Sequence, residues 1–406
     1  MKSFEIPSIF KSSIIGKIKE SRRVKDKLKK DFKPTVLDFG PVRFLIARHF
    51  GFCYGVENAV EIAYKTLTEN EEKRIFLLSE MIHNPDVNAD LIAKGMRFIR
   101  ETNGNQIIDW EEITKDDIVI VPAFGTTVEI YEKLAKIGVE VEKYDTTCPF
   151  VEKVWNRAEQ ISQRNYTIVI HGQPAHEETK ATFSHSQKNG PAIVVRDMKQ
   201  AEKLASFMKK EMDLAEFLLE FKGQFSSNFD PENDLNKIGV VNQTTMLASD
   251  TQGIADFLKK VILKVHNAAP NETELYFANT RDTLCYATND NQEAVHGLLA
   301  EKADLAIVVG GYKSANTMHL VELCEEKLPT FFIESASKLI SRNEIFHFNF
   351  HEKTEFFSDN YLNSSLPLTI MLTCGASCPD SVMEGVLLKL VSFFENTKSV
   401  EEVLEF

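Results

Sequence analysis

The sequence predicts an α/β protein made of three related units arranged around one centre. Three stretches of the chain repeat one order of elements: a cysteine before a helix, then two short apolar strands, each followed by a polar turn and another helix. Self-similarity on this scale indicates repeated structural units. Strands that are apolar on both faces are typical of parallel sheets covered by helices.

The copies are located by their cysteines and by the polar residues that follow. The expected strands are, in chain order, 75–78, 118–121, 167–170, 238–241, 306–309 and 369–372. The spacing from each cysteine to the next polar group is nearly constant: 30 residues from Cys53 to His83, 28 from Cys148 to His176 and 31 from Cys285 to Asn316. Functional residues of parallel sheets gather at the carboxyl ends of strands, where helix N-termini also favour phosphate. The sequence therefore predicts three thiols below a polar, anion-binding pocket.

The spacing of the cysteines also sets the expected domain boundaries. The first two are 95 residues apart and the last two 137 apart. Residues 207–236 account for the excess, because this charged segment with scattered Phe interrupts the second copy; we expect a surface loop or an extra helix. A further insertion is expected around 341–366. The predicted division is a basic extension 1–43, α/β domains 44–147, 148–283 and 284–396, and an acidic tail 397–406.

Charge and composition exclude several classes of protein. The 406 residues include 47 basic and 60 acidic side chains, a net charge of −13 that disfavours bulk attraction to nucleic acid. Apolar runs are only strand-sized, so neither a membrane span nor a signal-peptide core is expected. Six cysteines in so long a chain fit a reducing, cytoplasmic (bacterial) setting, with the plastid stroma as the alternative.

The first 33 residues differ from the rest of the chain. They carry eleven basic and four acidic residues, with apolar residues at helical spacing. This pattern predicts an amphipathic helix packed on the surface. A transit peptide and a docking site for an acidic electron carrier are the alternatives.

The three matched cysteines are candidate metal ligands. Zinc sites commonly use four ligands in close C-x-x-C pairs, which this chain lacks. Three thiolates from three units could instead hold an iron–sulfur cluster, a [4Fe–4S] cluster with one iron open to substrate. Three buried structural cysteines are the alternative. The unmatched Cys324, Cys374 and Cys378 are expected to pack, although a disulfide or a second metal site is conceivable for the last two.

Polar residues in the turns suggest the chemistry of the pocket. His83 and His176 occupy the same repeat position and can donate to phosphate oxygens. Glu178 is a candidate proton donor. Hydroxyl and amide groups recur at equivalent turns, in Thr244, Ser314, Asn316 and Ser377. These four could hold a diphosphate, or they could simply be turn formers.

Over about residues 44–396 the chain resembles the 4-hydroxy-3-methylbut-2-enyl diphosphate reductase family, and in particular its plant and cyanobacterial branch. The motifs that carry this resemblance are Gly51-Phe52-Cys53, His83-Asn84, Thr147-Cys148-Pro149, His176-Glu177-Glu178, Gln243-Thr244-Thr245, Cys285-Tyr286-Ala287-Thr288, Ser314 to Asn316 and Gly375-Ala376-Ser377. Two positions depart from the usual bacterial pattern. Phe124 stands where many bacterial members have a diphosphate-contacting histidine, and Ala315 where a serine is usual.

The resemblance implies a fold, a cofactor and a role for each candidate residue. It implies a trefoil of three α/β domains around one [4Fe–4S] cluster, held by Cys53, Cys148 and Cys285 with an open apical iron. It assigns the diphosphate to His83, His176, Ser314, Asn316 and Ser377. It makes Glu178 the proton source and places Thr244 beside the substrate hydroxymethyl group.

The implied reaction is a reductive dehydroxylation. An allylic alcohol diphosphate would lose its hydroxyl as water and give isopentenyl and dimethylallyl diphosphates, the last step of non-mevalonate isoprenoid synthesis. Electrons would come from ferredoxin or flavodoxin, because no nucleotide-binding glycine fingerprint is evident. Two alternatives remain open: a quinolinate synthase-like enzyme, in which Arg-rich clamps would be expected, and a non-enzymatic iron–sulfur redox sensor, which needs no polar ring.

Overall fold

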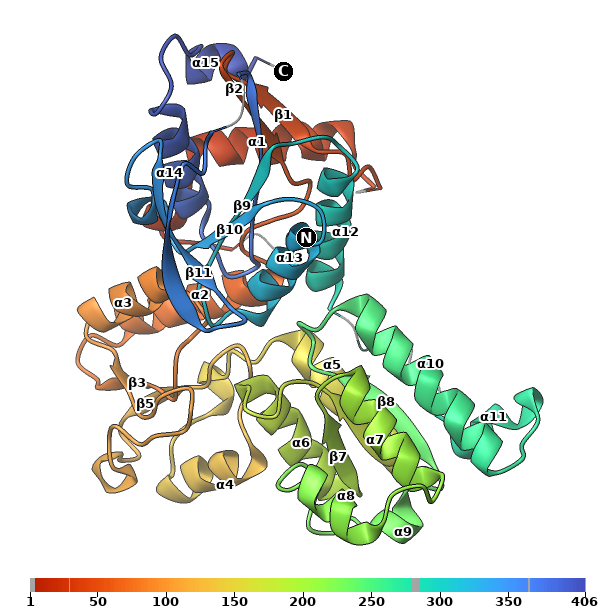
Figure 1. Cartoon of the computed structure of the whole chain (residues 1–406). Coiled ribbons are helices and arrows are strands. Elements are labelled where there is room, and N and C mark those ends of the chain that lie inside the picture. The colour runs from red at the N-terminus through yellow and green to blue at the C-terminus, as the bar shows by residue number, and fades with distance from the viewer. Residues whose placement is uncertain (1–3, 29, 279–282, 284, 364–365, 406) are drawn as a thin grey trace. The chain divides into compact units, whose positions relative to one another are not determined.

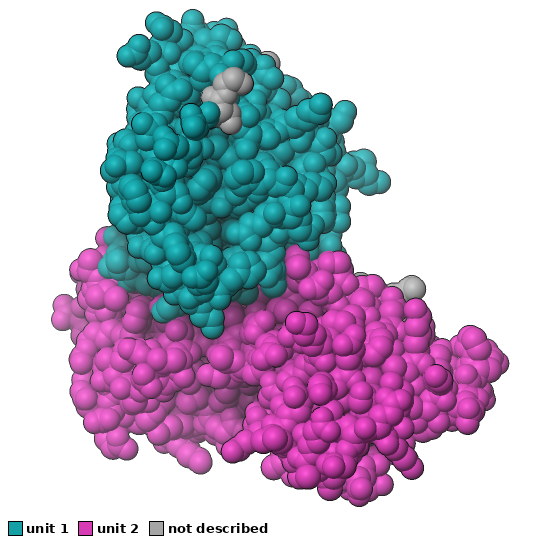
Figure 2. All heavy atoms as spheres, in the orientation of Figure 1, with its two compact units in different colours: residues 1–64, 82–90, 286–406 teal, residues 65–81, 91–285 magenta. Residues whose placement is uncertain are grey.

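The computed structural model describes residues 4–28, 30–278, 283, 285–363 and 366–405. The chain divides into two compact units (Figure 2). The first unit comprises Met1–Tyr64, Ile82–Asp90 and Tyr286–Phe406, and the second comprises Lys65–Met81 and Leu91–Cys285. Each unit is described by itself below.

The first unit contains a five-stranded sheet of order β1-β2-β13-β9-β10 and a separate hairpin (Figure 1). Its strands are β1 (Thr35–Asp38), β2 (Val42–Ile46), β9 (Leu305–Val309), β10 (Thr330–Ile333), β11 (Glu344–Asn349), β12 (Thr354–Asp359) and β13 (Leu368–Cys374). Its helices are η1 (Ser8–Phe10), α1 (Ser13–Lys25), α12 (Tyr286–Leu299), α13 (Ala315–Glu325), η5 (Ala336–Lys338), α14 (Asp380–Val391) and α15 (Val400–Val403), with the starts of α2 (Tyr54–Glu69) and α3 (Pro85–Ala93). All pairings in the large sheet are parallel except that of β1 with β2.

The second unit contains two three-stranded parallel sheets, of orders β4-β3-β5 and β7-β6-β8. Its strands are β3 (Ile75–Leu77), β4 (Arg97–Phe98), β5 (Ile118–Ile120), β6 (Thr167–His171), β7 (Ala192–Val195) and β8 (Ile238–Asn242). Its helices are η2 (Trp110–Glu112), α4 (Val128–Ile137), η3 (Glu142–Tyr144), α5 (Pro149–Ser162), α6 (Glu177–Asn189), α7 (Met198–Met208), α8 (Leu214–Glu220), α9 (Pro231–Asp234), α10 (Ala248–Val265), η4 (Pro270–Glu272) and α11 (Thr273–Tyr276).

The predicted repeat is present in all three parallel sheets. The two strands expected in each copy are parallel neighbours: β3 with β5, β6 with β8, and β9 with β13. A third strand pairs in each case with the free edge of the first: β4, β7 and β10. The core strands are buried along their whole length, since they are apolar on both faces. All six predicted strands, and with them the α/β fold class, are confirmed.

The segments that precede the three cysteines lie next to sheets of other copies. The segment before Cys53 contains β2, which pairs with β13 of the third copy and not with the first. The segment before Cys148 forms a bridge between Asp145 and Val121, next to β5 of the first copy. The segment before Cys285 bridges to β8 of the second. Each cysteine therefore follows the sheet of the preceding copy, and the predicted boundary at residue 44 falls inside β2. The division into three domains stays a prediction.

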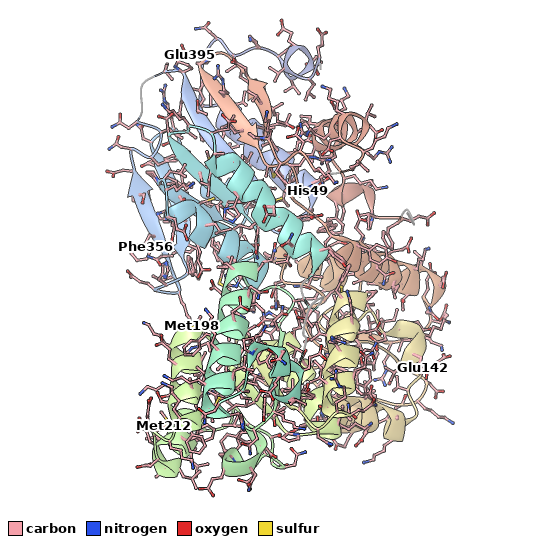
Figure 3. The ribbon with its side chains drawn as sticks, turned by 90° about the vertical axis from the view of Figure 1, so that its right-hand side faces the viewer. His49, Glu142, Met198, Met212, Phe356 and Glu395 are labelled. Carbon is pink, nitrogen blue, oxygen red and sulfur yellow. The ribbon has the colours of Figure 1, made fainter. Side chains whose placement is uncertain are left out.

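Both predicted insertions have defined structure. Within 207–236 lie α8 and α9, and Phe217 and Phe221 of this segment are completely buried against α7 and α10. Figure 3 labels Met198, which begins α7, and Met212, which follows its end. Aspartates cap α7, α8 and α9 by accepting backbone N–H bonds. The segment is therefore helical and part of a core, and not a surface loop. In the third copy the insertion contains the hairpin β11–β12.

The basic extension forms the expected helix. α1 covers Ser13–Lys25, and Ser12 caps it by accepting a bond from the N–H of Ile15. Ile15 and Ile18 are buried, whereas the basic residues lie mostly on the exposed side. Within the described parts of the chain, no helix combines the length and the apolar character that crossing a bilayer requires.

Candidate active site

The three matched cysteines share one local setting. Each stands directly before the first residue of a helix: Cys53 before α2, Cys148 before α5 and Cys285 before α12. Free N–H groups at a helix start carry partial positive charge, which favours the thiolate over the thiol. Thiolate is the form that binds metal.

Two of the other three cysteines lie in settings that favour the protonated thiol. Cys324 is completely buried inside α13, and burial raises its pKa to about 12. Cys374 and Cys378 are also fully buried, and a hydrogen bond between the two thiols, together with burial, holds the pKa of Cys378 well above its usual range. Cys324, Cys374 and Cys378 form no disulfide. These three therefore match the predicted packing role, and no disulfide joins them.

In the first unit, the loop after β13 connects four of the predicted site residues. The carbonyl oxygen of Ala376 accepts a bond from the N–H of Cys53 (3.2 Å). The N–H of Ala376 donates to Oδ1 of Asn316 (2.8 Å). The hydroxyl of Ser377 donates to the carbonyl oxygen of His83 (3.2 Å). The structure thus brings Cys53, Asn316, Ser377 and His83 together: Ala376 joins the first two, and Ser377 bonds His83.

Asn316 contributes a buried donor to this group of residues. Its Oδ1 accepts from Ala376 and, at 3.5 Å, from Nδ2 of Asn291. Its own Nδ2 is buried and has no hydrogen-bond partner among the described residues. A buried amide donor without a partner costs free energy, so this arrangement favours a bound acceptor. Ser314 caps α13 by accepting from the N–H of Thr317, which leaves its hydroxyl proton to donate.

The turn after β9 approaches His83 so closely that only glycine fits. A Cβ on Gly311 would lie 2.3 Å from the carbonyl oxygen of His83. Any side chain would therefore push apart the loops that carry His83 and Ser314.

In the second unit, the turn after β5 lies beside Cys148 and His176. The N–H of Cys148 donates to the carbonyl oxygen of Ala123 (3.0 Å). The ring of Phe124 meets the imidazole of His176 edge to face, with centroids 5.7 Å apart. Gly125 has φ +73°, and a Cβ there would lie 2.5 Å from the Trp155 ring. Phe124 is therefore a packing partner that orients His176.

His176 and Glu178 are fixed at the start of α6. Nδ1 of His176 accepts the N–H of Glu178 (3.2 Å), so the proton of the neutral ring lies on Nε2, which can donate to an anion. Glu178 is only 2% exposed, and burial raises its pKa to about 7. The Thr244 N–H and hydroxyl donate to the Glu178 carboxylate, which lowers that pKa in part. At neutral pH this carboxyl group is about half protonated, which suits a proton donor.

Arg100 is a residue that the sequence prediction missed. Its side chain is 18% exposed and lies 3.9 Å from the carboxylate of Glu177. It donates to the hydroxyl of Thr126 (3.3 Å), and its Nε has no partner among the described residues. Burial lowers its pKa, and the nearby Glu177 carboxylate raises that pKa in part. The only sequence feature that could have indicated a role for Arg100 is its position soon after β4. A single arginine in a polar loop forms no recognisable motif.

The first unit carries a buried amide donor beside its parallel strands, the second carries an acid of raised pKa, and both have thiols at helix starts. These features define an α/β protein with candidate anion-binding and catalytic residues. Residues 44–391 match the family described as LytB protein, and the chain belongs to this family.

Several relatives are similar over most of their length. A 4-hydroxy-3-methylbut-2-enyl diphosphate reductase of Trichodesmium erythraeum is 35% identical over 386 residues, which are 95% of this chain and 90% of the relative. A protein of the same name from Gloeothece citriformis is 39% identical over 352 residues, 86% of this chain and 85% of the relative.

Two solved structures are also similar. One is a structure of (E)-4-hydroxy-3-methyl-but-2-enyl diphosphate reductase, described as the terminal enzyme of the non-mevalonate pathway. It has 26% identity, a TM-score of 0.52, and coverage of 86% of this chain and 99% of its own. The other is the Plasmodium falciparum E-1-hydroxy-2-methyl-but-2-enyl-4-diphosphate reductase, with 21% identity, a TM-score of 0.61, and coverage of 86% and 87%. The second comparison bears on the fold alone.

Proposed function

We propose that this chain is a 4-hydroxy-3-methylbut-2-enyl diphosphate reductase, the terminal enzyme of the non-mevalonate pathway. It converts (E)-4-hydroxy-3-methylbut-2-enyl diphosphate into isopentenyl and dimethylallyl diphosphates. The observation that carries the proposal is Glu178, a buried acid of pKa about 7 held by Thr244 next to a histidine whose Nε2 is a donor. The identity of the substrate is taken from the names of the relatives.

The cofactor in this proposal is one [4Fe–4S] cluster with an open apical iron. Cys53, Cys148 and Cys285 would hold it, since each offers a thiol at a helix start. The other three cysteines are completely buried, and the pKa values of Cys324 and Cys378 are raised. No group of three potential metal ligands is gathered among the described residues, so ligation is inferred from the setting of each thiol. When bound, the cluster supplies single-electron transfer and a Lewis-acidic iron for the substrate oxygen.

The chain's own residues bind the diphosphate and supply the proton. In the first unit the donors are His83, Ser314, Asn316 and Ser377, of which Asn316 has the buried Nδ2 described above. In the second unit the donor is Nε2 of His176. Hydrogen bonds to a charged diphosphate are stronger than those between neutral groups.

Glu178 would protonate the departing hydroxyl group, which leaves as water. Thr244 would lie beside the hydroxymethyl group, because it already bonds the Glu178 carboxylate through its N–H and hydroxyl. The overall reaction consumes two electrons and two protons. Ferredoxin or flavodoxin is the proposed donor, and a cytoplasmic location belongs to the same proposal.

Turnover by the anaerobically purified holoprotein tests this function. With reduced methyl viologen as electron source, we expect consumption of the allylic alcohol diphosphate and formation of both isoprenoid diphosphates. Absence of turnover by protein with full iron and sulfide content would refute the reductase assignment. Binding without turnover, together with a change of DNA or protein binding on oxidation, would favour a redox sensor instead.

A further inference from the structure

The basic N-terminal segment is firmly attached to the first unit. α1 packs on α14 through Ile15 and Ile18, which are buried. Nζ of Lys19 lies 2.7 Å from the carboxylate of Asp380, the first residue of α14. The hydroxyl of Ser12 bonds Glu384 in the same helix. The helix therefore has a fixed orientation on this unit.

The same segment packs on the loop that carries Cys53. Three ring contacts join the two: Phe4 with Tyr54 at 4.9 Å, Phe10 with Phe52 at 6.1 Å, and the Lys19 ammonium with Phe50 at 4.9 Å. These contacts touch the residues on both sides of Cys53. The extension is thus in direct contact with the loop of a proposed cluster ligand.

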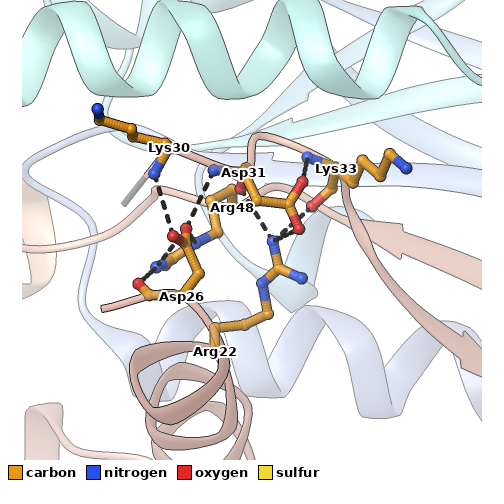
Figure 4. A network of polar contacts seen from close by, with 6 residues as sticks. All are labelled: Arg22, Asp26, Lys30, Asp31, Lys33 and Arg48. Carbon is orange, nitrogen blue, oxygen red and sulfur yellow. Dashed lines mark hydrogen bonds and ion pairs between the residues drawn. The ribbon is translucent and has the colours of Figure 1, made fainter. Parts of the chain in front are cut away.

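A network of polar contacts then holds the chain after α1 in place. Figure 4 shows its members, Arg22, Asp26, Lys30, Asp31, Lys33 and Arg48. The Asp26 carboxylate accepts two backbone N–H groups of the following loop and pairs with Arg48 at 3.4 Å. Arg22 donates to the carbonyl oxygens of Asp31 and Lys33, both at 3.0 Å. These contacts hold the chain after α1 against Arg22 and Arg48, whose side chains are largely buried.

The lysines of this segment remain on the outside. Lys17, Lys27 and Lys30 are exposed, and no ion pair of their side chains occurs within the described residues. Val24 and Leu28 lie between them in the sequence and are 62% and 76% exposed. An exposed cationic surface favours a partner with an acidic surface. The chain as a whole is acidic, so this cationic surface is a local feature.

We propose that this surface, which we call the lysine face (Lys17, Lys27 and Lys30 with Val24 and Leu28), is the docking site of an acidic one-electron carrier protein. The inference rests on the proposed function, which needs two electrons per turnover. Each docking event would oxidise the carrier by one electron and reduce the cluster by one. Charge complementarity would steer an acidic partner to this face, and the extension's contact with the Cys53 loop would place that partner next to a cluster ligand.

Charge reversal tests the lysine face. In the variant Lys17→Glu, Lys27→Glu, Lys30→Glu, we expect KM for a reduced [2Fe–2S] ferredoxin of net negative charge to rise about tenfold or more at low salt. The difference should shrink as salt is added, because salt screens exposed charges. Turnover with reduced methyl viologen should equal that of the wild type, which also shows that the variant is folded and loaded with its cluster.

A matched control reverses three exposed lysines of the second unit, Lys222→Glu, Lys237→Glu and Lys260→Glu. It changes the net charge by the same amount and should leave the ferredoxin KM within about twofold of the wild type. An unchanged KM in the lysine-face variant, or an equal rise in the control, would overturn the proposal. Loss of binding to phosphatidylglycerol vesicles without a change in ferredoxin kinetics would overturn it in favour of a lipid surface. Failure of all proteins to turn over with viologen would instead refute the reductase function.

Discussion

Glu178 offers the most quantitative test of the mechanism. Glu178→Gln keeps the shape of the side chain, and its amide oxygen can still accept the N–H of Thr244. What it loses is the transferable proton. We therefore expect kcat to fall by about 10² to 10⁴, the usual contribution of a general acid, while substrate binding is largely kept.

The raised pKa of Glu178 sets the pH dependence. Its folded-state pKa is about 7 and its ordinary value is 4.5. Only the protonated form can donate, so wild-type kcat should decline as pH rises through about 7 and be about tenfold lower at pH 8 than its acid limit. In Glu178→Gln this decline should be absent.

The raised pKa of Glu178 also predicts how the free energy of unfolding changes with pH. Because the folded state binds this proton more tightly than the unfolded state, stability is highest at low pH and is lost as pH rises through 7. Between pH 5 and pH 8 the loss from this group is about 2.5 kcal/mol. Urea unfolding should show that Glu178→Gln loses correspondingly less stability over this range.

Stopped anaerobic assays with saturating viologen and substrate measure the rate, and a pH series from 6 to 9 gives the profile. Near wild-type turnover by Glu178→Gln would refute the proton-donor role. An unaltered decline above pH 7 in the variant would show that another group titrates there, and an effect on KM alone would assign Glu178 to binding.

Three further changes test other parts of the site. Cys148→Ser should lose iron and sulfide in chemical analysis, whereas Cys324→Ser, which alters a buried thiol, should keep both; full cluster content in the first would contradict the ligand assignment. Asn316→Asp keeps the acceptor oxygen but removes the buried donor, and should raise the substrate KM about tenfold or more, since a bond to a charged group contributes about 1.5–3 kcal/mol; an unchanged KM would exclude Asn316 from the diphosphate site. Gly125→Ala places a Cβ 2.5 Å from Trp155 at a positive φ, and should lower the free energy of unfolding by about 1–3 kcal/mol; equal melting temperatures would contradict this packing argument.

The strands could be predicted from the sequence because each is a short, continuous apolar run. Thr167 to Ile170 and Ile238 to Val241, for example, fall inside β6 and β8. Helices after the strands were likewise expected. One of them, α4 (Val128–Ile137), ends at Gly138, whose positive φ is an ordinary helix end. Local chemistry determines all of these elements.

Other features depend on contacts between distant segments and could not be predicted. The pairing of β2 with β13 joins residues more than 300 positions apart, and no local pattern specifies it. The composition of 207–236 left a surface loop and an extra helix open. The segment is helical, but the entry of phenylalanines such as Phe217 into a core was not foreseen. Arg100 belongs to the site only because the fold brings it to Thr126. The absence of histidine at Phe124 was visible, but its edge contact with His176 was not.

The pairing of β2 with β13 has a consequence for the order in which the protein matures. During synthesis, β5 and β8 exist before the segments of Cys148 and Cys285 that bridge to them. The Cys53 segment is made early, but its neighbouring strand ends at Cys374, near the end of the chain. During synthesis the Cys53 segment therefore lacks its neighbouring strand β13, whereas the segments of Cys148 and Cys285 follow strands that already exist. Pairing between segments so far apart in the sequence is slow. The ligand set proposed above, which includes Cys53, would therefore be complete only once β13 has been made.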